Sequence, residues 1–123
     1  MENFLNIHPD QILEQTQYFV LIADQFPVSP GHLLVISKDW KNDFFDLSQE
    51  EREDMLLAIQ GAKDLIESEY KPEGFNIGMN CGSVAGQTVM HFHCHVIPRY
   101  KGDMKDPRGG VRHVIPSKGN YKK

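Results

Sequence analysis

The chain has 123 residues, 40% of them apolar and 24% charged, a composition typical of one soluble globular domain spanning residues 1–123. Its net charge of −4, with no run of five lysines or arginines, disfavours a nucleic-acid polymer as partner. The longest wholly apolar run, Phe19 to Ile22, is too short to cross a membrane, and the acidic, proline-broken N-terminus is unlike a signal peptide. Cys81 and Cys94 suggest no disulfide framework, so we expect a cytoplasmic protein.

Two neighbouring strands are predicted in the first third of the chain. Residues 16–24 (TQYFVLIAD) and 32–38 (HLLVISK) are rich in aliphatic and aromatic residues and are bounded by polar ones. The connection between them, QFPVSPGH, contains prolines and a glycine that favour a turn. Because this link is short, we expect the two strands to pair antiparallel. A short helix is also predicted near residue 10, after Pro9.

One long helix is predicted over residues 46–71 (DLSQEEREDMLLAIQGAKDLIESEYK). Ser48 and Glu51 fit the S-x-x-E pattern of a capping box at its start. Acidic residues crowd the first turn, where they complement the positive end of the helix dipole. The apolar residues repeat at helical spacing and predict a buried stripe: Met55, Leu56, Ile59, Ala62, Leu65 and Ile66.

The second half of the chain predicts two more strands and an irregular tail. Residues 75–81 (FNIGMNC) and 88–100 (TVMHFHCHVIPRY) have strand composition, with a loop over 82–87 between them. The tail, residues 101–123, is rich in glycine and proline and is expected to be mostly loop. Strands, one long helix and further strands together predict an α+β fold with a central antiparallel sheet.

Three histidines stand on alternate positions of the last predicted strand. Since side chains alternate between faces in a strand, His91, His93 and His95 are expected to share one face with Val89 and Ile97. The other face is apolar and should pack on the helix, which makes Cys94 a small core residue there and not a reactive thiol. That face comprises Met90, Phe92, Cys94 and Val96.

Two chemical roles for these histidines remain open on spacing alone. A straight strand rises about 3.3 Å per residue, so His91 and His95 lie roughly 13 Å apart and all three rings cannot easily hold one metal ion. A zinc site would need ligands from elsewhere, such as His32 or Asp24. Alternatively, neighbours roughly 7 Å apart leave room for a phosphoryl group, with one imidazole attacking it and the others donating hydrogen bonds. A purely structural role is disfavoured because the opposite face already supplies the core.

The residues around the histidines resemble a known family. HFHCHVI matches the histidine-triad pattern, in which histidines alternate with apolar residues, at every position. AGQTVMHFHCHVIPR and FPVSPGHLLVISK also resemble histidine-triad (HIT) proteins, of the branch similar to the fragile-histidine-triad dinucleoside polyphosphate hydrolases. The resemblance covers roughly residues 16–100, and the tail segment DPRGGVRHVIP is similar to bacterial-type relatives. It implies a HIT-like fold that dimerises, with the two sheets joining across the interface.

The resemblance also assigns roles to the histidines. His93 matches the nucleophile of the family, and His95 matches the residue that contacts the phosphate or the leaving group. His91 and His32 match supporting histidines that hold the triad in place. The implied activity is cleavage at the α-phosphate of dinucleoside polyphosphates or related adenylated compounds, through a nucleotidyl-histidine that water hydrolyses to a nucleoside monophosphate, expected to be AMP.

The same resemblance suggests which residues bind the nucleotide. Asn80 matches a polar side chain near the scissile phosphate, and Asp24 matches a position that binds the ribose hydroxyls. The family's phosphate-binding loop is expected at Gln87 and Thr88, where flexible glycines let backbone N–H groups approach phosphate oxygens; these are Gly82 and Gly86. The base pocket is expected to involve Phe19 and Ile22.

Several alternatives stay open within this reading. The substrate could instead be an adenylated amine, and a nucleotide-binding module with little activity is a further possibility. We expect no protein-bound metal or other cofactor, because three histidines on one strand diverge and no C-x-x-C near the N-terminus offers the zinc knuckle of some HIT branches, although Mg²⁺ could accompany the substrate. The partners expected are a nucleotide and a second copy of the chain. The arginines Arg99, Arg108 and Arg112 could reach a substrate phosphate or the partner subunit, or could simply aid solubility.

Overall fold

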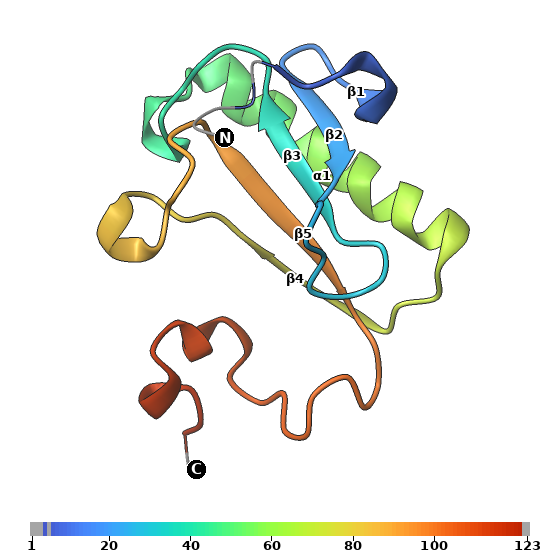
Figure 1. Cartoon of the computed structure of the whole chain (residues 1–123), viewed down its shortest axis with the longest axis vertical. Helices are drawn as coiled ribbons and strands as arrows, with labels where there is room; N and C mark the ends of the chain where they lie inside the picture. Colours follow the sequence, from blue (N-terminus) through green and yellow to red (C-terminus); the bar gives the residue numbers. More distant parts are fainter. Residues whose placement is uncertain (1–3, 5, 122–123) are drawn as a thin grey trace.

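A five-stranded antiparallel sheet with one helix across it forms the body of the protein (Figure 1). The computed structural model describes Phe4 and residues 6–121. The strands lie in the order β1-β2-β3-β5-β4. Their bounds are Ile12–Gln15 (β1), Phe19–Ala23 (β2), Leu33–Ser37 (β3), Gly74–Gly78 (β4) and His93–Arg99 (β5), and the helix α1 is Gln49–Glu69. Short 3-10 turns lie at Pro9–Gln11 (η1), Phe44–Asp46 (η2), Ser83–Ala85 (η3), Gly110–Val114 (η4) and Pro116–Lys118 (η5).

The predicted α+β class, the antiparallel sheet and the long helix are confirmed. The helix begins with the expected capping box, in which the Ser48 hydroxyl accepts from the Glu51 N–H at 3.1 Å and the Glu51 carboxylate accepts from the Ser48 N–H at 2.8 Å. The predicted stripe is wrong at Leu56, whose side chain is 67% exposed. The helix buries Ala58 in its place, because the narrower stripe at positions 55, 58, 62 and 66 faces the sheet.

The strands differ from the prediction chiefly at β1 and at the start of β5. The sequence did not predict β1, in which only Ile12 is even partly buried, so it shows no alternation of apolar and polar residues. The last strand was predicted from residue 88 but begins at His93. Upstream, the Phe92 N–H donates to the Lys41 carbonyl at 2.6 Å, so the chain there pairs with the loop after β3. The expected alternation of faces nevertheless extends back to His91, because His91 and His93 both contact Phe4 on the uncovered side, whereas Phe92 between them lies in the core under α1.

The two faces of the sheet have different environments. The face under α1 forms the main core, with Phe19, Val35 and Cys94 fully buried, which confirms Cys94 as a core residue. The opposite face carries a smaller apolar cluster that includes Ile22 and Leu34. Strand register places His95 beside Leu34 and His93 beside Ile36 on this second face. The histidines therefore stand on the side of the sheet that α1 leaves uncovered. No helix among the described residues is long and apolar enough to cross a membrane.

Candidate active site

A pocket of about 420 Å³ opens on the uncovered face of the sheet, and it contains His93 and His95. We call it the histidine pocket. Its apolar wall comes from β2, β3 and the N-terminal segment, and includes Ile7, Ile22 and Leu34. Its polar residues come from loops at the strand ends and include Asp24, Asn80 and Thr88. The pocket thus combines an apolar wall with a few convergent polar groups, as small-molecule sites commonly do.

The His93 ring is held in one tautomer. Its Nδ1 lies 2.9 Å from the carbonyl oxygen of His91, and a carbonyl can only accept a hydrogen bond. Nδ1 therefore carries the hydrogen, and Nε2 keeps an unshared electron pair. The Phe4 ring packs edge-on against this imidazole, with centroids 5.0 Å apart. His93 consequently presents a nucleophilic nitrogen in a fixed orientation.

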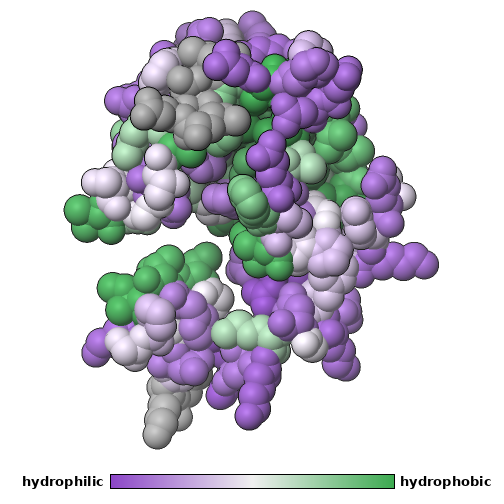
Figure 2. Space-filling model, in the orientation of Figure 1, coloured by the Kyte–Doolittle hydropathy of each residue, from purple (hydrophilic) through white to green (hydrophobic). Residues whose placement is uncertain are grey.

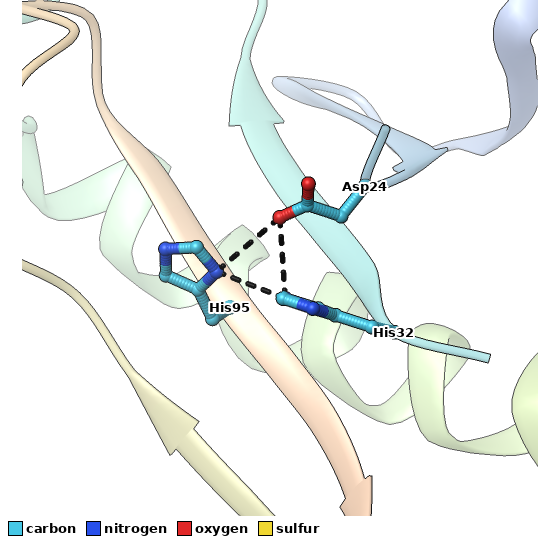
Figure 3. Close-up of side chains that lie close together, drawn as sticks. All are labelled: Asp24, His32 and His95. Atoms are coloured by element: carbon cyan, nitrogen blue, oxygen red, sulfur yellow. Dashed lines mark hydrogen bonds and ion pairs between the residues drawn. The ribbon is translucent and has the colours of Figure 1, made fainter. Parts of the chain in front are cut away.

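The His95 ring is held in the opposite tautomer by a chain of hydrogen bonds. The Val28 N–H donates to Nδ1 of His32 at 3.0 Å, so the hydrogen of a neutral His32 must lie on its Nε2. That Nε2 lies 2.9 Å from Nδ1 of His95 and donates to it. The hydrogen of His95 therefore lies on Nε2, where it is free to donate to a ligand. Figure 3 shows His32, His95 and Asp24 converging from three different segments.

Burial keeps His32 and His95 neutral. The pKa of His95 is lowered to about 4, mainly by desolvation and further by the neighbouring His93 and His32, against an opposing effect of Asp24. Burial also lowers the pKa of His32, again against the Asp24 carboxylate. The Asp24 oxygen is 3.4 Å from Nε2 of His32 and 3.8 Å from Nδ1 of His95. Both rings are thus uncharged near pH 7, as the hydrogen-bond chain requires.

His91 lies outside the histidine pocket and is completely buried. Its Nε2 donates to the Ser37 carbonyl at 2.8 Å, and its Nδ1 accepts from the Phe4 N–H at 3.2 Å. The Trp40 ring stacks on it at 6.1 Å between centroids, and burial lowers its pKa. The ring is therefore a fixed part of the protein interior, and its backbone carbonyl is the group that orients His93.

The residues predicted to bind phosphate divide into those that line the histidine pocket and two, Gly82 and Gln87, that do not. Asn80, Gly86 and Thr88 line the histidine pocket. Gly86 adopts the left-handed conformation, φ 97°, that favours glycine. Gln87 is 4% exposed, and its side chain accepts from the Gly82 N–H and donates to the carbonyls of Asn42 and Val89. The Gln87 side chain therefore stabilises the loop by hydrogen bonds to its backbone and does not face the histidine pocket.

The base-pocket prediction is correct at one position and wrong at the other. Ile22 lines the histidine pocket, whereas Phe19 is fully buried in the core under α1. These two residues are three apart in one strand, so they must point to opposite faces. Sequence reasoning also missed Phe4, Ile7 and Trp40. The apolar residues of the N-terminal segment were a signal for the first two, but nothing in the sequence pointed to the site role of Trp40.

A model of the HIT domain matches residues 6–102 of this chain. The chain belongs to the HIT domain family. It is 34% identical over 100 residues to a bis(5'-adenosyl)-triphosphatase of Dictyostelium discoideum, covering 81% of this chain and 67% of that protein. It is 33% identical over 96 residues to an asymmetrical bis(5'-nucleosyl)-tetraphosphatase of Schizosaccharomyces pombe, covering 78% and 53% respectively. The matched region is thus a little over half to two thirds of the length of these relatives.

A solved HIT structure has the same fold and raises the question of a metal. The zinc-bound histidine triad family protein of Mycobacterium smegmatis aligns with a TM-score of 0.69 and 36% identity, covering 77% of this chain and 69% of that one. Among the described residues of the present chain, Asp24, His32 and His95 bring three possible ligand atoms within 4.8 Å of one another. A zinc-bound Nε2 would leave the hydrogen of His32 on Nδ1, where it would face the Val28 N–H. This donor arrangement does not fit a metal at that position.

Proposed function

We propose that this HIT protein is a nucleotide hydrolase or transferase that cleaves dinucleoside polyphosphates at an α-phosphate and releases a nucleoside monophosphate. One observation carries the proposal: two adjacent imidazoles, 5.3 Å apart between centroids, are held in opposite tautomers. His93 offers an electron pair and His95 offers an N–H, which are the nucleophile and the donor that phosphoryl transfer requires.

In the first half-reaction, Nε2 of His93 attacks the α-phosphorus. The bond from that phosphorus to the bridging oxygen breaks, and the oxygen leaves with the electron pair as part of a nucleotide anion. The phosphorylated imidazole is then cationic, and its Nδ1–H remains hydrogen-bonded to the His91 carbonyl. The Nε2–H of His95 donates to a phosphate or leaving-group oxygen that gains negative charge. In the second half-reaction, water attacks the phosphorus, the bond from phosphorus to Nε2 breaks, and its electron pair returns to His93. The proton that the water gives up passes to solvent, and the nucleoside monophosphate is released.

Substrate binding follows from the composition of the histidine pocket. We assign the base to the wall that contains Ile22 and Leu34, and the ribose to the Asp24 carboxylate, which accepts hydrogen bonds from hydroxyls. We assign the α-phosphate to Thr88, Asn80 and the backbone at Gly86. No protein-bound metal enters this scheme, and Mg²⁺ would arrive with the polyphosphate. The relatives named as triphosphatase and tetraphosphatase support this substrate class.

The proposal is tested by a substrate panel together with trapping of the intermediate. Purified protein is incubated with diadenosine polyphosphates and with AMP-amidates, and the products are resolved by chromatography. We expect AMP from the diadenosine compounds, and label from the substrate on His93 after an alkaline quench, which preserves the acid-labile phosphoramidate. His93→Ala should lose at least about 10³-fold in kcat and still bind AMP, because the covalent route disappears while the pocket remains.

Two further variants make this test specific. His95→Ala should keep measurable turnover, since it removes a hydrogen-bond donor and not the bond-forming atom. His8→Ala is the matched control, because the His8 ring is exposed and lies outside the histidine pocket. Label on His95, or full activity of His93→Ala, would show that the nucleophile is wrongly assigned. Turnover of AMP-amidates alone would move the protein to the adenylated-amine class.

A further inference from the structure

Charge is divided unevenly between the body of the protein and its tail. Residues 1–100 contain 15 acidic and 6 basic side chains, for a net charge of −9, whereas residues 101–123 contain 2 acidic and 7 basic ones, for a net charge of +5. No lysine or arginine is among the described residues that line the histidine pocket. A polyphosphate substrate carries several negative charges, so it should be attracted to the net positive charge of the tail and repelled by the net negative charge of the body.

The tail is a folded lobe and not a loose end. A Cβ at Gly109 would collide with the Gly119 carbonyl, and Gly109 has a φ of 93° that favours glycine. Arg112 donates to the carbonyls of Lys118 and Gly119 and stacks over Tyr121. Figure 1 shows this lobe below the sheet, joined to the end of β5. These contacts give the tail a defined internal structure. Charges that serve only solubility do not need such a structure.

A second pocket, of about 360 Å³, lies between this lobe and the sheet. We call it the tail cleft; Figure 2 shows the gap between the tail and the body from one side. Asn76 and Ile97 line it from the sheet, and Met104, Pro107 and His113 line it from the tail. Its volume is similar to that of the histidine pocket and lies within the range of small-ligand sites, about 300–1,000 Å³.

The tail cleft continues the histidine pocket along the same face of the sheet. Ile97 follows His95 by two residues in β5, so it lies roughly 7 Å farther along the strand and points to the same side. Across the ladder, Gly78 pairs with His95 and Asn76 pairs with Ile97, so the next row of the sheet face belongs to the cleft. The two pockets are therefore successive sites on one surface.

The order of the histidines directs the leaving group toward this cleft. In phosphoryl transfer the attacking and leaving atoms lie roughly in line on opposite sides of the phosphorus. His93 provides the attacking atom, and His95, one row farther toward Ile97, provides the N–H for the departing side. A leaving group that departs from His93 past His95 moves toward the tail.

We propose that the tail cleft is a leaving-group subsite that binds the second nucleotide of a dinucleoside polyphosphate, with the basic tail beside its phosphates. This inference rests on the function proposed above. Ile97, Met104 and Pro107 offer apolar contact to a nucleoside. The side-chain carbonyl oxygen of Asn76 accepts from Arg99 at 2.6 Å, which leaves the side-chain amide N–H groups of Asn76 to donate. Lys101 and Lys105 line an adjoining pocket that shares Asn76, Met104 and Pro107 with the tail cleft, and they supply positive charge beside it.

The first test fills the cleft and compares two substrates. An AMP-amidate has a small leaving group that does not reach the cleft. The leaving group of diadenosine tetraphosphate is ATP, which is large enough to reach it. In Ile97→Trp, the ratio of kcat/KM for the tetraphosphate to that for the amidate should fall by at least about tenfold, because only one substrate loses contacts. Thermal unfolding and AMP binding verify that the variant is folded. An unchanged ratio in the folded variant would overturn the proposal.

The second test reverses the charge of two exposed tail lysines and requires no substitution in the core. The double variant Lys101→Glu with Lys105→Glu should lower the same ratio by about tenfold and weaken its salt dependence. Lys38→Glu with Lys71→Glu makes the same charge change on exposed positions outside both pockets, and is the matched control. Equal losses in the two double variants would mean that net charge alone is responsible, which would contradict a local subsite.

A binding measurement separates this proposal from the proposed function. The probe is a diadenosine tetraphosphate analogue with methylene bridges, titrated calorimetrically beside AMP. Wild-type protein should bind the analogue at least about tenfold more tightly than AMP, and Ile97→Trp should abolish that advantage. If this holds while no turnover occurs, the subsite stands and the hydrolase function fails. If turnover occurs while the analogue and AMP bind equally, the function stands and the subsite is overturned.

Discussion

At the scale of single residues, two identical side chains acquire opposite chemistry from the backbone groups that they contact. A carbonyl oxygen fixes the hydrogen of His93 on Nδ1. An amide N–H, acting through His32, fixes the hydrogen of His95 on Nε2. Because both constraints come from backbone atoms, they do not depend on the presence of a ligand. In the proposed mechanism, the two rings are thus oriented for nucleophilic attack before substrate arrives, which avoids the cost of reorganisation.

The buried neutral histidines predict a pH dependence of stability. The folded pKa of His95 is about 4, below the 6.5 of an unperturbed histidine, so between these values the unfolded chain binds more protons than the folded one. The free energy of unfolding should therefore be fully retained above about pH 6.5 and should decrease toward pH 4, by at most about 1.4 kcal/mol per pH unit for His95. The lowered pKa values of His32 and His91 act in the same direction.

Urea denaturation between pH 5 and 7 measures this slope. His95→Gln is the informative comparison, because carboxylates titrate in both proteins and only the His95 contribution is removed. The variant should show a shallower loss of unfolding free energy on acidification. Identical slopes for the two proteins would mean that His95 titrates in the folded protein much as it does in the unfolded chain.

At the scale of elements, the sequence predicts what is encoded locally. The capping box at Ser48 and the apolar stripe of α1 depend on neighbours within a few residues, and both were predicted, the stripe with an error only at Leu56 and Ala58. The alternation from His93 to Arg99 likewise appears as alternating burial. The segment just before β5 was not predicted correctly, because its backbone pairs with Lys41, about fifty residues away. The start of β5 at His93 follows from that distant pairing, whereas the face on which His91 lies follows from its spacing to His93.

Trp40 links the loop after β3 to the segment that carries His91. Its ring stacks on His91, and its Nε1–H donates to the Met90 carbonyl at 2.8 Å. Because Trp40 is half-exposed, we expect Trp40→Ala to reduce the free energy of unfolding by about 2 kcal/mol, less than for a fully buried tryptophan. It should also lower kcat, since the His91 carbonyl that orients His93 becomes less constrained. Trp40 does not line the histidine pocket, so KM should change little.

Two comparisons distinguish positioning from general destabilisation. Trp40→Phe keeps an aromatic ring on His91 and loses the indole N–H that donates to the Met90 carbonyl and to the Asn42 side chain, so it should recover most of kcat and cost about 1 kcal/mol of unfolding free energy. Phe45→Ala removes a 70% exposed aromatic residue from the following 3-10 turn and serves as the control. If Trp40→Ala resembled Phe45→Ala in both kcat and stability, Trp40 would have no positioning role.

At the scale of the whole molecule, the sheet has the main hydrophobic core on one face and the candidate binding sites on the other. Helix α1 and the main core cover one face, and both pockets lie on the other. The sequence predicted this division, since the residues between the histidines are apolar. It did not predict that Phe4 and Ile7 complete the wall of the pocket. Phe4 is held there by a hydrogen bond to His91, 87 residues away, and Ile7 packs on residues of β2 and β3, so no local pattern encodes either contact.

The two edges of the sheet differ in a way that bears on assembly. Strand β1 has four residues and an irregular register between Ile12 and Glu14, features that discourage pairing with another strand. Strand β4 has regular pairing with β5 from Gly74 to Gly78, and among the described strands it pairs with no other. An open, regular edge favours addition of a strand from another copy of the chain. We therefore expect a homodimer that joins two sheets through β4.

Light scattering of the purified protein should then give a mass of about 28 kDa, twice the 14.1 kDa of one chain. Ile77 is 44% exposed on β4 and Leu13 is 49% exposed on β1, so the two edges offer matched positions for the same substitution. Ile77→Lys should shift the mass toward that of one chain, because a lysine beside the paired strands would have to be desolvated. Leu13→Lys should leave the dimer intact. A mass near 14 kDa for the wild type at micromolar concentration, or equal effects of the two lysines, would contradict assembly through β4.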